Sequence, residues 1–187
     1  MTLDVSPAPG GTRALLQSIV EVARAIFGAA ASSVFLLDDD AGELVFEAVA
    51  GEGQEFLVGT RIPANRGIAG WVVSSGQAMI VDDLVDNRTF ARDIAESTQY
   101  VPNAIMAAPL LVGGEVLGVL QVLDPAEQSR SDLGDLDLLA LFANQAATAL
   151  RVAKGCAHCG SQDDPLTHLD NDELVDVFRD FLRHRRG

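Results

Sequence analysis

Two cysteines near the carboxyl end of the chain are the side chains best suited to chemistry. Cys156 and Cys159 are separated by two residues, one of them His158, and Gly160 follows. A C-x-x-C pair followed by glycine is half of a zinc knuckle, because Zn²⁺ binds four sulfur or nitrogen ligands in a tetrahedron. One of the three histidines, His158, His168 or His184, or a C-x-x-C pair from a second copy of the chain, would complete such a site. A redox dithiol and two unbound thiols are the alternative interpretations.

Residues 1–155 contain no histidine and no cysteine. They therefore offer no axial histidine for haem, no thiol for a covalent bilin link and no Ser/His/Asp or Cys/His set for nucleophilic catalysis. We expect neither haem nor covalently bound bilin in this part of the chain, and we do not expect an enzyme.

Two arginines suggest an anion site. Arg66 lies directly before the predicted start of a helix at Gly67, where free backbone N–H groups favour a carboxylate or a phosphate. Arg61 and Arg66 would add positive charge. The alternative is that both side chains are solvated or pair with nearby acids.

The hydrophobic pattern predicts the elements that position these groups. Apolar residues at helical spacing predict a helix over Thr12–Phe27, with Thr12 as its cap and Gly28 as its end. A second, almost wholly apolar helix is predicted over Leu133–Ala153, with Gly155 as its C-cap. Strands are predicted over Ser32–Leu37, Glu43–Ala50, Gly59–Ile62, Ala78–Val81, Ala104–Leu111 and Glu115–Leu123.

Between the strands, the pattern predicts a short helix over Gly67–Ser75 and a long polar connection over Asp82–Pro102. Connections of about twenty residues without structure of their own are uncommon and are often lids. Two hairpins with few crossovers predict an α+β fold, in which helices flank an antiparallel sheet.

Composition limits the class of protein. The 187 residues are 48% hydrophobic and carry a formal net charge of −14, which disfavours nucleic acid and anionic membrane surfaces as partners. The sequence shows neither a membrane-spanning run nor a secretion signal, so we expect a cytoplasmic protein. We expect a flexible segment over 1–11, one domain over 12–154, a cysteine-containing linker over 155–170 and an amphipathic helix over 171–187.

Five segments together resemble the GAF family, the small-molecule-sensing domains related to PAS. The resemblance covers roughly Leu15 to Ala153, and it implies an antiparallel sheet with the first and last helices on one face. It also implies a ligand pocket on the other face, covered by the helix at Gly67 and by the Asp82–Pro102 lid. The segments are Arg61–Pro63, Gly67–Val72, Ile105–Leu110, Glu115–Leu123 and Leu138–Leu150.

The implied pocket gives a set of expected ligand-binding residues. Aromatic and methionine side chains on core elements are also ordinary packing material, so packing is the alternative for most of them. Phe90 and Asp93 echo a pattern of the cyclic-nucleotide-binding branch, but the spacing is compressed and the ligand stays an unidentified small molecule. The expected wall residues are Phe46, Ala48, Trp71, Val81, Phe90, Tyr100, Met106 and Gln121.

These observations predict a regulatory module that binds a small molecule, forms a homodimer through its first and last helices and signals to a downstream protein. The main alternative is a protein-interaction scaffold whose pocket is filled by its own side chains. An enzyme is disfavoured, because the expected pocket has no cysteine or histidine.

Overall fold

The computed structural model of the chain describes residues 10–51, 55–82, 84, 100–126 and 134–159. The chain divides into two units, residues 1–153 and residues 154–187. The sheet and the helices up to Ala153 belong to the first unit. No helix in the described ranges is both long enough and apolar enough to cross a bilayer.

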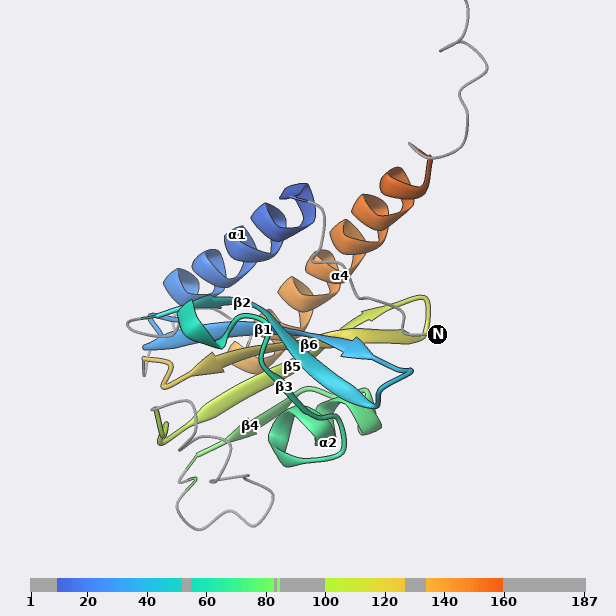
Figure 1. Cartoon of the computed structure of the whole chain (residues 1–187). Coiled ribbons are helices and arrows are strands. Elements are labelled where there is room, and N and C mark those ends of the chain that lie inside the picture. Colours follow the sequence, from blue (N-terminus) through green and yellow to red (C-terminus); the bar gives the residue numbers. More distant parts are fainter. Residues whose placement is uncertain (1–9, 52–54, 83, 85–99, 127–133, 160–187) are drawn as a thin grey trace, which may run out of the picture. The chain divides into compact units, whose positions relative to one another are not determined.

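Six strands form one antiparallel sheet in the order β3-β2-β1-β6-β5-β4 (Figure 1). The hairpins β1–β2 and β5–β6 are joined by the pairing of β1 with β6. The first and last strands of the chain therefore lie side by side at the centre of the sheet. The strands β2 and β6 have the predicted bounds. The strands are β1 Ala31–Asp38, β2 Glu43–Ala50, β3 Arg61–Pro63, β4 Met79–Val81, β5 Ile105–Val112 and β6 Glu115–Leu123.

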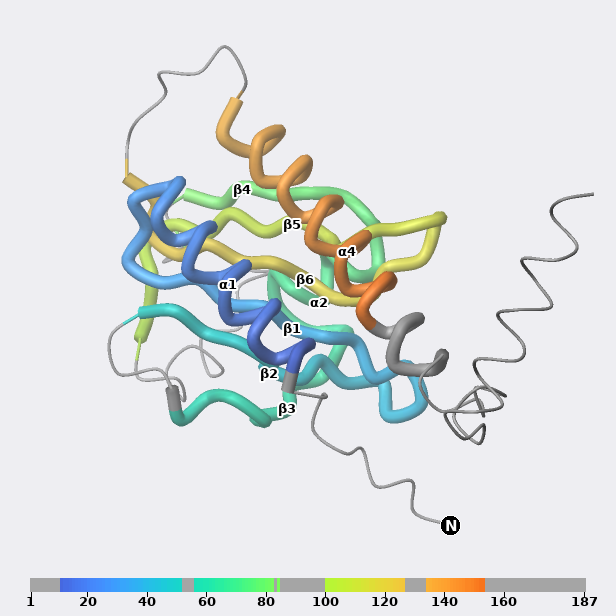
Figure 2. Tube along the Cα trace, turned by 90° about the horizontal axis from the view of Figure 1, so that it is seen from above, coloured from blue at the N-terminus to red at the C-terminus, as the bar shows by residue number. Residues whose placement is uncertain are grey.

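Two long helices cover one face of the sheet. Helices α1 (Gly10–Ile26) and α4 (Asp135–Cys159) lie side by side on this face and run in opposite directions (Figures 1 and 2). Helix α2 (Gly67–Ser75) lies on the opposite face, and a 3-10 turn, η1, spans Glu55–Leu57. The α+β fold expected from the sequence is confirmed, whereas most of the expected lid lies outside the described residues.

Strand alternation gives each face its own apolar core. The core under α1 and α4 contains Val34, Leu120 and Val122 from the sheet, packed against residues such as Leu16 and Leu139. The core under α2 contains the intervening residues of the same strands. Its buried members are Phe35, Leu44, Phe46, Val49, Leu57, Ile62, Ile68, Ala69, Val72, Val81, Leu84, Ile105, Ala107 and Val119.

Three predicted helix ends are wrong. Helix α1 begins at Gly10, so Thr12 is a buried residue within the helix and not its cap. Helix α4 begins at Asp135 and continues through Gly155 to Cys159. A glycine inside a helix costs only about 1 kcal/mol relative to alanine, and neighbouring helix formers such as Lys154 offset it. The predicted end of α1 at Gly28 is confirmed, because Gly28 has a left-handed φ of 56°.

Candidate functional site

The face of the sheet under α2 is the expected ligand side, and α2 packs closely on the loop before it. Its N-cap is Arg66, and Gly76 ends it in the left-handed conformation, donating its N–H to the carbonyl of Val72 at 2.9 Å. A Cβ at Gly70 would lie 2.9 Å from the carbonyl oxygen of Ala64. Glycine at this position therefore lets α2 lie against the loop.

Two polar side chains lie in the middle of this apolar face. Ser33 and Gln121 pair directly across β1 and β6, and each is more than nine-tenths buried, with 4% and 8% of its surface exposed. Ala107 pairs with Gln121 on its other side. The rows above and below the pair are apolar. They contain Phe35 with Val119 and Ile105 with Leu123.

No fully buried side-chain nitrogen or oxygen in the described ranges lacks a hydrogen-bond partner, and neither Ser33 nor Gln121 forms a side-chain hydrogen bond there, so their polar atoms keep some access to the surface. Ser32, the adjacent buried serine, differs, because its hydroxyl donates to the backbone carbonyl of Gln121 at 3.0 Å. Buried polar groups normally find a partner in protein, water or ligand. The carboxamide of Gln121 and the hydroxyl of Ser33 thus form a small polar patch suited to the polar edge of a bound molecule.

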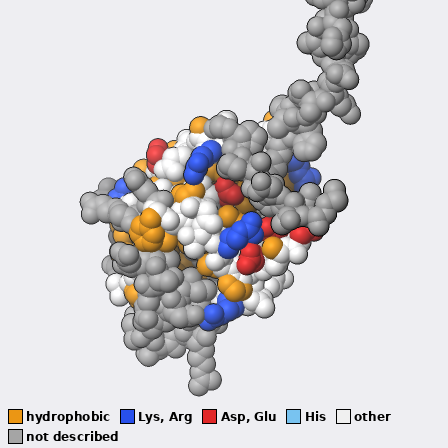
Figure 3. Space-filling view, in the orientation of Figure 1, with side chains coloured by type: hydrophobic (Ala, Val, Ile, Leu, Met, Phe, Trp, Pro, Cys, Tyr) orange, Lys and Arg blue, Asp and Glu red, His pale blue; other side chains and the backbone are white. Residues whose placement is uncertain are grey.

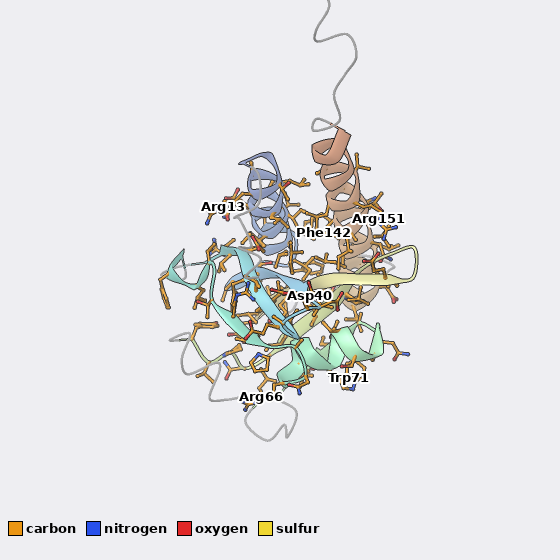
Figure 4. All side chains as sticks on the ribbon, turned by 45° about the vertical axis from the view of Figure 1, so that its right-hand side comes forward. Arg13, Asp40, Arg66, Trp71, Phe142 and Arg151 are labelled. Carbon is orange, nitrogen blue, oxygen red and sulfur yellow. The ribbon has the colours of Figure 1, made fainter. Side chains whose placement is uncertain are left out.

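Three of the expected wall residues lie on this face, two of them in its apolar core and one in the polar patch itself. Phe46 packs on Phe35 with ring centroids 4.1 Å apart, and Val81 belongs to the same core. Gln121 is the third. Trp71 is on α2 but belongs to neither core, and its side chain points away from the sheet with 37% of its surface exposed (Figure 4).

Ala48 and Met106 lie on the opposite face, under α1 and α4, so the expectation that they line the pocket is wrong. Met106 alternates with Ile105 and Ala107 along β5 and therefore points the other way. Ala48 would share the face of Phe46 in a regular strand. A bulge in β2 changes the register between these two residues and turns Ala48 over.

Arg61 is occupied by neighbouring acids, as the alternative interpretation predicted. Its Nη1 lies 2.8 Å from Asp38 and 2.9 Å from Glu43. The hydrogen bond from Arg61 holds the pKa of Asp38 below its ordinary value. On the molecular face shown in Figure 3, basic side chains likewise lie beside acidic ones. Arg66 lies at the start of α2 (Figure 4), so an anion site there would depend on Arg66 and not on Arg61.

The GAF domain model matches residues 12–150, about three quarters of the chain. This chain belongs to the GAF domain family. GAF domains are sensory and regulatory modules, and the matched range contains the whole sheet together with α2.

Known proteins similar to this GAF domain belong to several systems. The probable 3′,5′-cyclic phosphodiesterase pde-5 of Caenorhabditis elegans is 25% identical over 150 residues, which is 75% of this chain and 20% of that protein. The GAF domain of a phosphoenolpyruvate-protein phosphotransferase from Coxiella burnetii has 20% identity and a TM-score of 0.69, covering 81% of this chain and 89% of that one. The second GAF domain of DevS from Mycobacterium smegmatis has 21% identity and a TM-score of 0.63, covering 79% and 99%.

These similarities support different conclusions. The solved structures are similar at low identity and therefore show the fold alone. The chain spans only 10 to 20% of the length of the curated relatives it matches, so their catalytic activities belong to much longer proteins.

Asp124 forms a half-buried contact with Tyr100 that the sequence pattern did not predict, although Tyr100 was an expected wall residue. Asp124 follows β6 with a left-handed φ of 48°, and its carboxylate accepts hydrogen bonds from the hydroxyl of Tyr100 and from the N–H groups of Asn103 and Ala104. Burial, with a further contribution from Asp124, raises the pKa of Tyr100 to about 12. The Asp124-Pro125 pair directly after a predicted strand is the sequence feature that could have indicated a turn at this position. Tyr100 is therefore an anchor of the loop before β5.

Several expected site residues lie outside the described residues. They include Phe90 and Asp93, most of the Asp82–Pro102 lid and everything after Cys159. Cys156 and Cys159 lie in the last turn of α4, one helical turn apart, and not in the linker predicted over 155–170.

The zinc interpretation stays a prediction. Two chains that align their α4 helices would bring four sulfur ligands together, and we expect about one Zn²⁺ per dimer in protein purified without chelator. Elemental analysis of the wild type and of Cys156→Ser measures this directly. The variant should lose the metal. Zinc-free wild-type protein whose two thiols react freely with a thiol reagent would leave two unbound cysteines as the interpretation.

Proposed function

We propose that this GAF domain senses an uncharged small molecule, works as a homodimer and passes its bound state to a partner protein. The observation that carries the ligand part is the buried polar pair, Ser33 and Gln121, within an apolar sheet face. A pair without protein partners among the described residues retains its hydrogen-bonding capacity for a ligand.

The chemistry of the face defines the ligand class. Its buried residues are apolar except for Ser33 and Gln121, and no charged side chain is buried anywhere in the described ranges. An ionised group placed there would remain unpaired, which is costly in an apolar environment. A carboxamide both donates and accepts, so it suits a flat group that presents a donor beside an acceptor, such as an amide or a heterocyclic ring edge.

Cyclic nucleotides are reasonable first probes, because the matched relatives include cyclic-nucleotide phosphodiesterases. A base could meet Gln121 while its phosphate stays at the rim of the face. The pairing of Arg61 with Asp38 and Glu43 does not favour this class, since it removes one of the two expected phosphate partners.

A scaffold without a ligand is the second candidate. The packing of Phe46 on Phe35 and the complete burial of Val72 and Leu84 favour it, because these side chains fill part of the face themselves. We propose binding and not catalysis in either case, since residues 1–155 supply no cysteine or histidine.

Native mass spectrometry of the purified protein tests the proposal, because it reports ligand and oligomeric state together. We expect a dimer carrying a small-molecule adduct. Gln121→Leu should lose the adduct or bind at least about tenfold more weakly, because leaving a ligand's polar group unpaired costs about 1–3 kcal/mol.

Gln17→Leu is the matched control, since Gln17 lies on α1 across the sheet and should leave the adduct unchanged. Cyclic GMP and cyclic AMP would be added to any adduct-free protein and followed by calorimetry. Wild-type protein that carries no adduct and shows no binding of cyclic GMP or cyclic AMP would favour the scaffold. An adduct retained in Gln121→Leu would show that the ligand does not bind at the polar pair.

A further inference from the structure

A second buried serine lies behind the polar pair, on the other face of the sheet. Ser32 directly precedes Ser33 in β1, and it pairs with Val122 of β6. Val122 and the other members of this row, Ala50 and Met106, all belong to the apolar core under α1 and α4. Ser32 is 0% exposed, so its hydroxyl is completely buried among apolar side chains.

The hydroxyl of Ser32 is satisfied by a residue of the candidate site. It donates to the backbone carbonyl of Gln121 at 3.0 Å. A buried hydroxyl without a hydrogen bond is costly, so this contact is what allows a serine at the position. Alanine would fill nearly the same volume and would need no partner. Packing alone therefore does not require the hydroxyl, and what the hydroxyl adds is a bond to the backbone of Gln121.

The apolar pattern of β1 and β6 does not determine how the two strands align, because both strands are apolar on both faces. Phe35 and Val119 belong to the core under α2. Val34 and Leu120 belong to the core under α1 and α4. A shift of the pairing by one residue would exchange one apolar set for the other, and it would carry Gln121 to the face under the two long helices. The register therefore depends on contacts of individual residues.

Two such contacts lie toward opposite ends of the paired stretch, which spans Ala31–Leu36 of β1. At one end, Gly118 lets β6 approach the carbonyl of Phe35, which a Cβ at this position would prevent. At the other end, Ser32 binds the carbonyl of Gln121. The polar pair lies between these contacts, and Ser32 is the one directly beside it.

We propose that Ser32 is a positioning residue of the candidate site. From the face under α1 and α4, its hydroxyl holds the backbone of Gln121 in the register that directs the carboxamide toward α2, beside Ser33. The inference rests on the proposed function, because it assigns the residue that holds the ligand-binding carboxamide in place. Ser32 itself lies on the opposite face from the ligand and acts through Gln121.

Gln17 makes a comparable bond to a different strand carbonyl, which provides a matched control. Its Nε2 donates from α1 to the carbonyl of Val49 at 3.1 Å. Val49 pairs with Ser33 on the side away from Gln121. Gln17→Leu therefore removes a side-chain donor to a strand carbonyl, as Ser32→Ala does, but it leaves the bond to the backbone of Gln121 intact.

The side-chain amide signals of Gln121 in a proton–nitrogen correlation NMR spectrum test the proposal without a ligand. Gln121→Leu identifies these signals, because they disappear in that variant. In Ser32→Ala they should move toward the position of an exposed glutamine such as Gln77, because the carboxamide is no longer held in one orientation. In Gln17→Leu they should keep their wild-type position.

Ser32→Thr separates the hydrogen bond from the packing. Threonine keeps the hydroxyl and adds a methyl group at a fully buried position, so urea unfolding should show lower stability than in the wild type. The amide signals of Gln121 should nevertheless stay near their wild-type position. A role of Ser32 in stability alone predicts the opposite, with signals that follow the stability of each variant and not the presence of the hydroxyl.

Native mass spectrometry measures the consequence for binding, with the co-purified adduct as the probe. At equal protein concentration, Ser32→Ala should hold the adduct roughly threefold to tenfold more weakly than the wild type, because a hydrogen bond of ordinary strength no longer fixes the binding group. Ser32→Thr and Gln17→Leu should both hold it as the wild type does.

The outcomes separate the inference from the proposed function. Amide signals that stay in place in Ser32→Ala, or that move equally in Gln17→Leu, overturn the role of Ser32 and leave the ligand proposal standing. An adduct weakened equally in Ser32→Ala and Ser32→Thr also overturns it, because the hydroxyl would then not matter. A wild type without an adduct counts against the ligand proposal, and the amide signals then decide whether Ser32 positions Gln121.

Discussion

Replacing Gly118 with alanine is expected to destabilise the domain by about 3 kcal/mol or to prevent folding, because overpacking a core typically costs up to this amount. A Cβ on Gly118 would lie 2.0 Å from the carbonyl oxygen of Phe35 and 3.0 Å from the Cα of Leu36. Both contacts are with backbone, so no side-chain rotation relieves them. The central pair of strands, β1 and β6, would have to separate.

The effect would extend to the candidate site. Gly118 pairs with Leu36, and the next residue, Val119, pairs with Phe35. Phe35 in turn packs on Phe46 and lies one row from the polar pair. The close approach of the two strands at Gly118 therefore holds the residues that enclose Ser33 and Gln121.

Urea unfolding followed by fluorescence measures the stability change, because the chain has a single tryptophan. Gly11→Ala is the control, since Gly11 lies in α1 with no atom within 4 Å of an added Cβ. Alanine there should leave stability unchanged or raise it by up to about 1 kcal/mol. A Gly118→Ala protein as stable as the wild type would contradict the close contact between β1 and β6.

The sequence predicted the elements well because their patterns are local. Alternating and continuous apolar runs located the bounds of β2 and β6, and the left-handed glycine at position 76 marked the end of α2. The two hairpins follow from their turn residues. The pairing of β1 with β6 could not be predicted from local sequence pattern. The antiparallel sheet was expected from the two predicted hairpins and from the resemblance to the family.

The site was predicted less completely, because its residues depend on non-local register. Because of the bulge in β2, Phe46 faces α2 whereas Ala48 faces α1. No residue type in that segment predicts the bulge. Gln121 was among the expected wall residues. Its direct pairing with Ser33 could not be predicted, because it depends on the β1–β6 register. The ion pairs of Arg61 join residues that are far apart in the sequence, so local sequence pattern could not predict them.

Replacing Asp124 with alanine is expected to destabilise the domain by about 1–2 kcal/mol. The change removes the acceptor of Tyr100, Asn103 and Ala104, and a typical hydrogen bond contributes about 0.5–1.5 kcal/mol; because the Asn103 bond is exposed and the other two are part-buried, water replaces part of what is lost. Alanine also tolerates the left-handed φ of position 124 less well than aspartate does. Asp124→Asn should be milder, since asparagine accepts this φ and keeps one oxygen for the two N–H groups.

Asp124→Asn also isolates the bond to Tyr100. Tyr100 is the only tyrosine of the chain, so absorbance at the phenolate band reports its ionisation alone. The wild-type pKa of about 12 should fall in Asp124→Asn, because the carboxylate no longer opposes a phenolate. The pKa should stay above the ordinary value of 10.0, because burial is the larger cause and remains. An unchanged pKa would show that Asp124 does not contact the hydroxyl in solution.

The raised pKa has a consequence for stability at high pH. The folded state favours the neutral hydroxyl, so this stabilisation is fully present below pH 10.0 and is lost as pH rises toward about 12. Urea unfolding at pH 9 and pH 11 should therefore show a larger loss for the wild type than for Tyr100→Phe, which has no phenol to ionise. Because Tyr100 and Asp124 hold the loop that leads into β5, ionising Tyr100 should release that loop before the sheet unfolds. Hydrogen exchange at the N–H groups of Asn103 and Ala104, faster at pH 11 in the wild type than in Tyr100→Phe after correction for intrinsic rates, would be the direct measurement of that release.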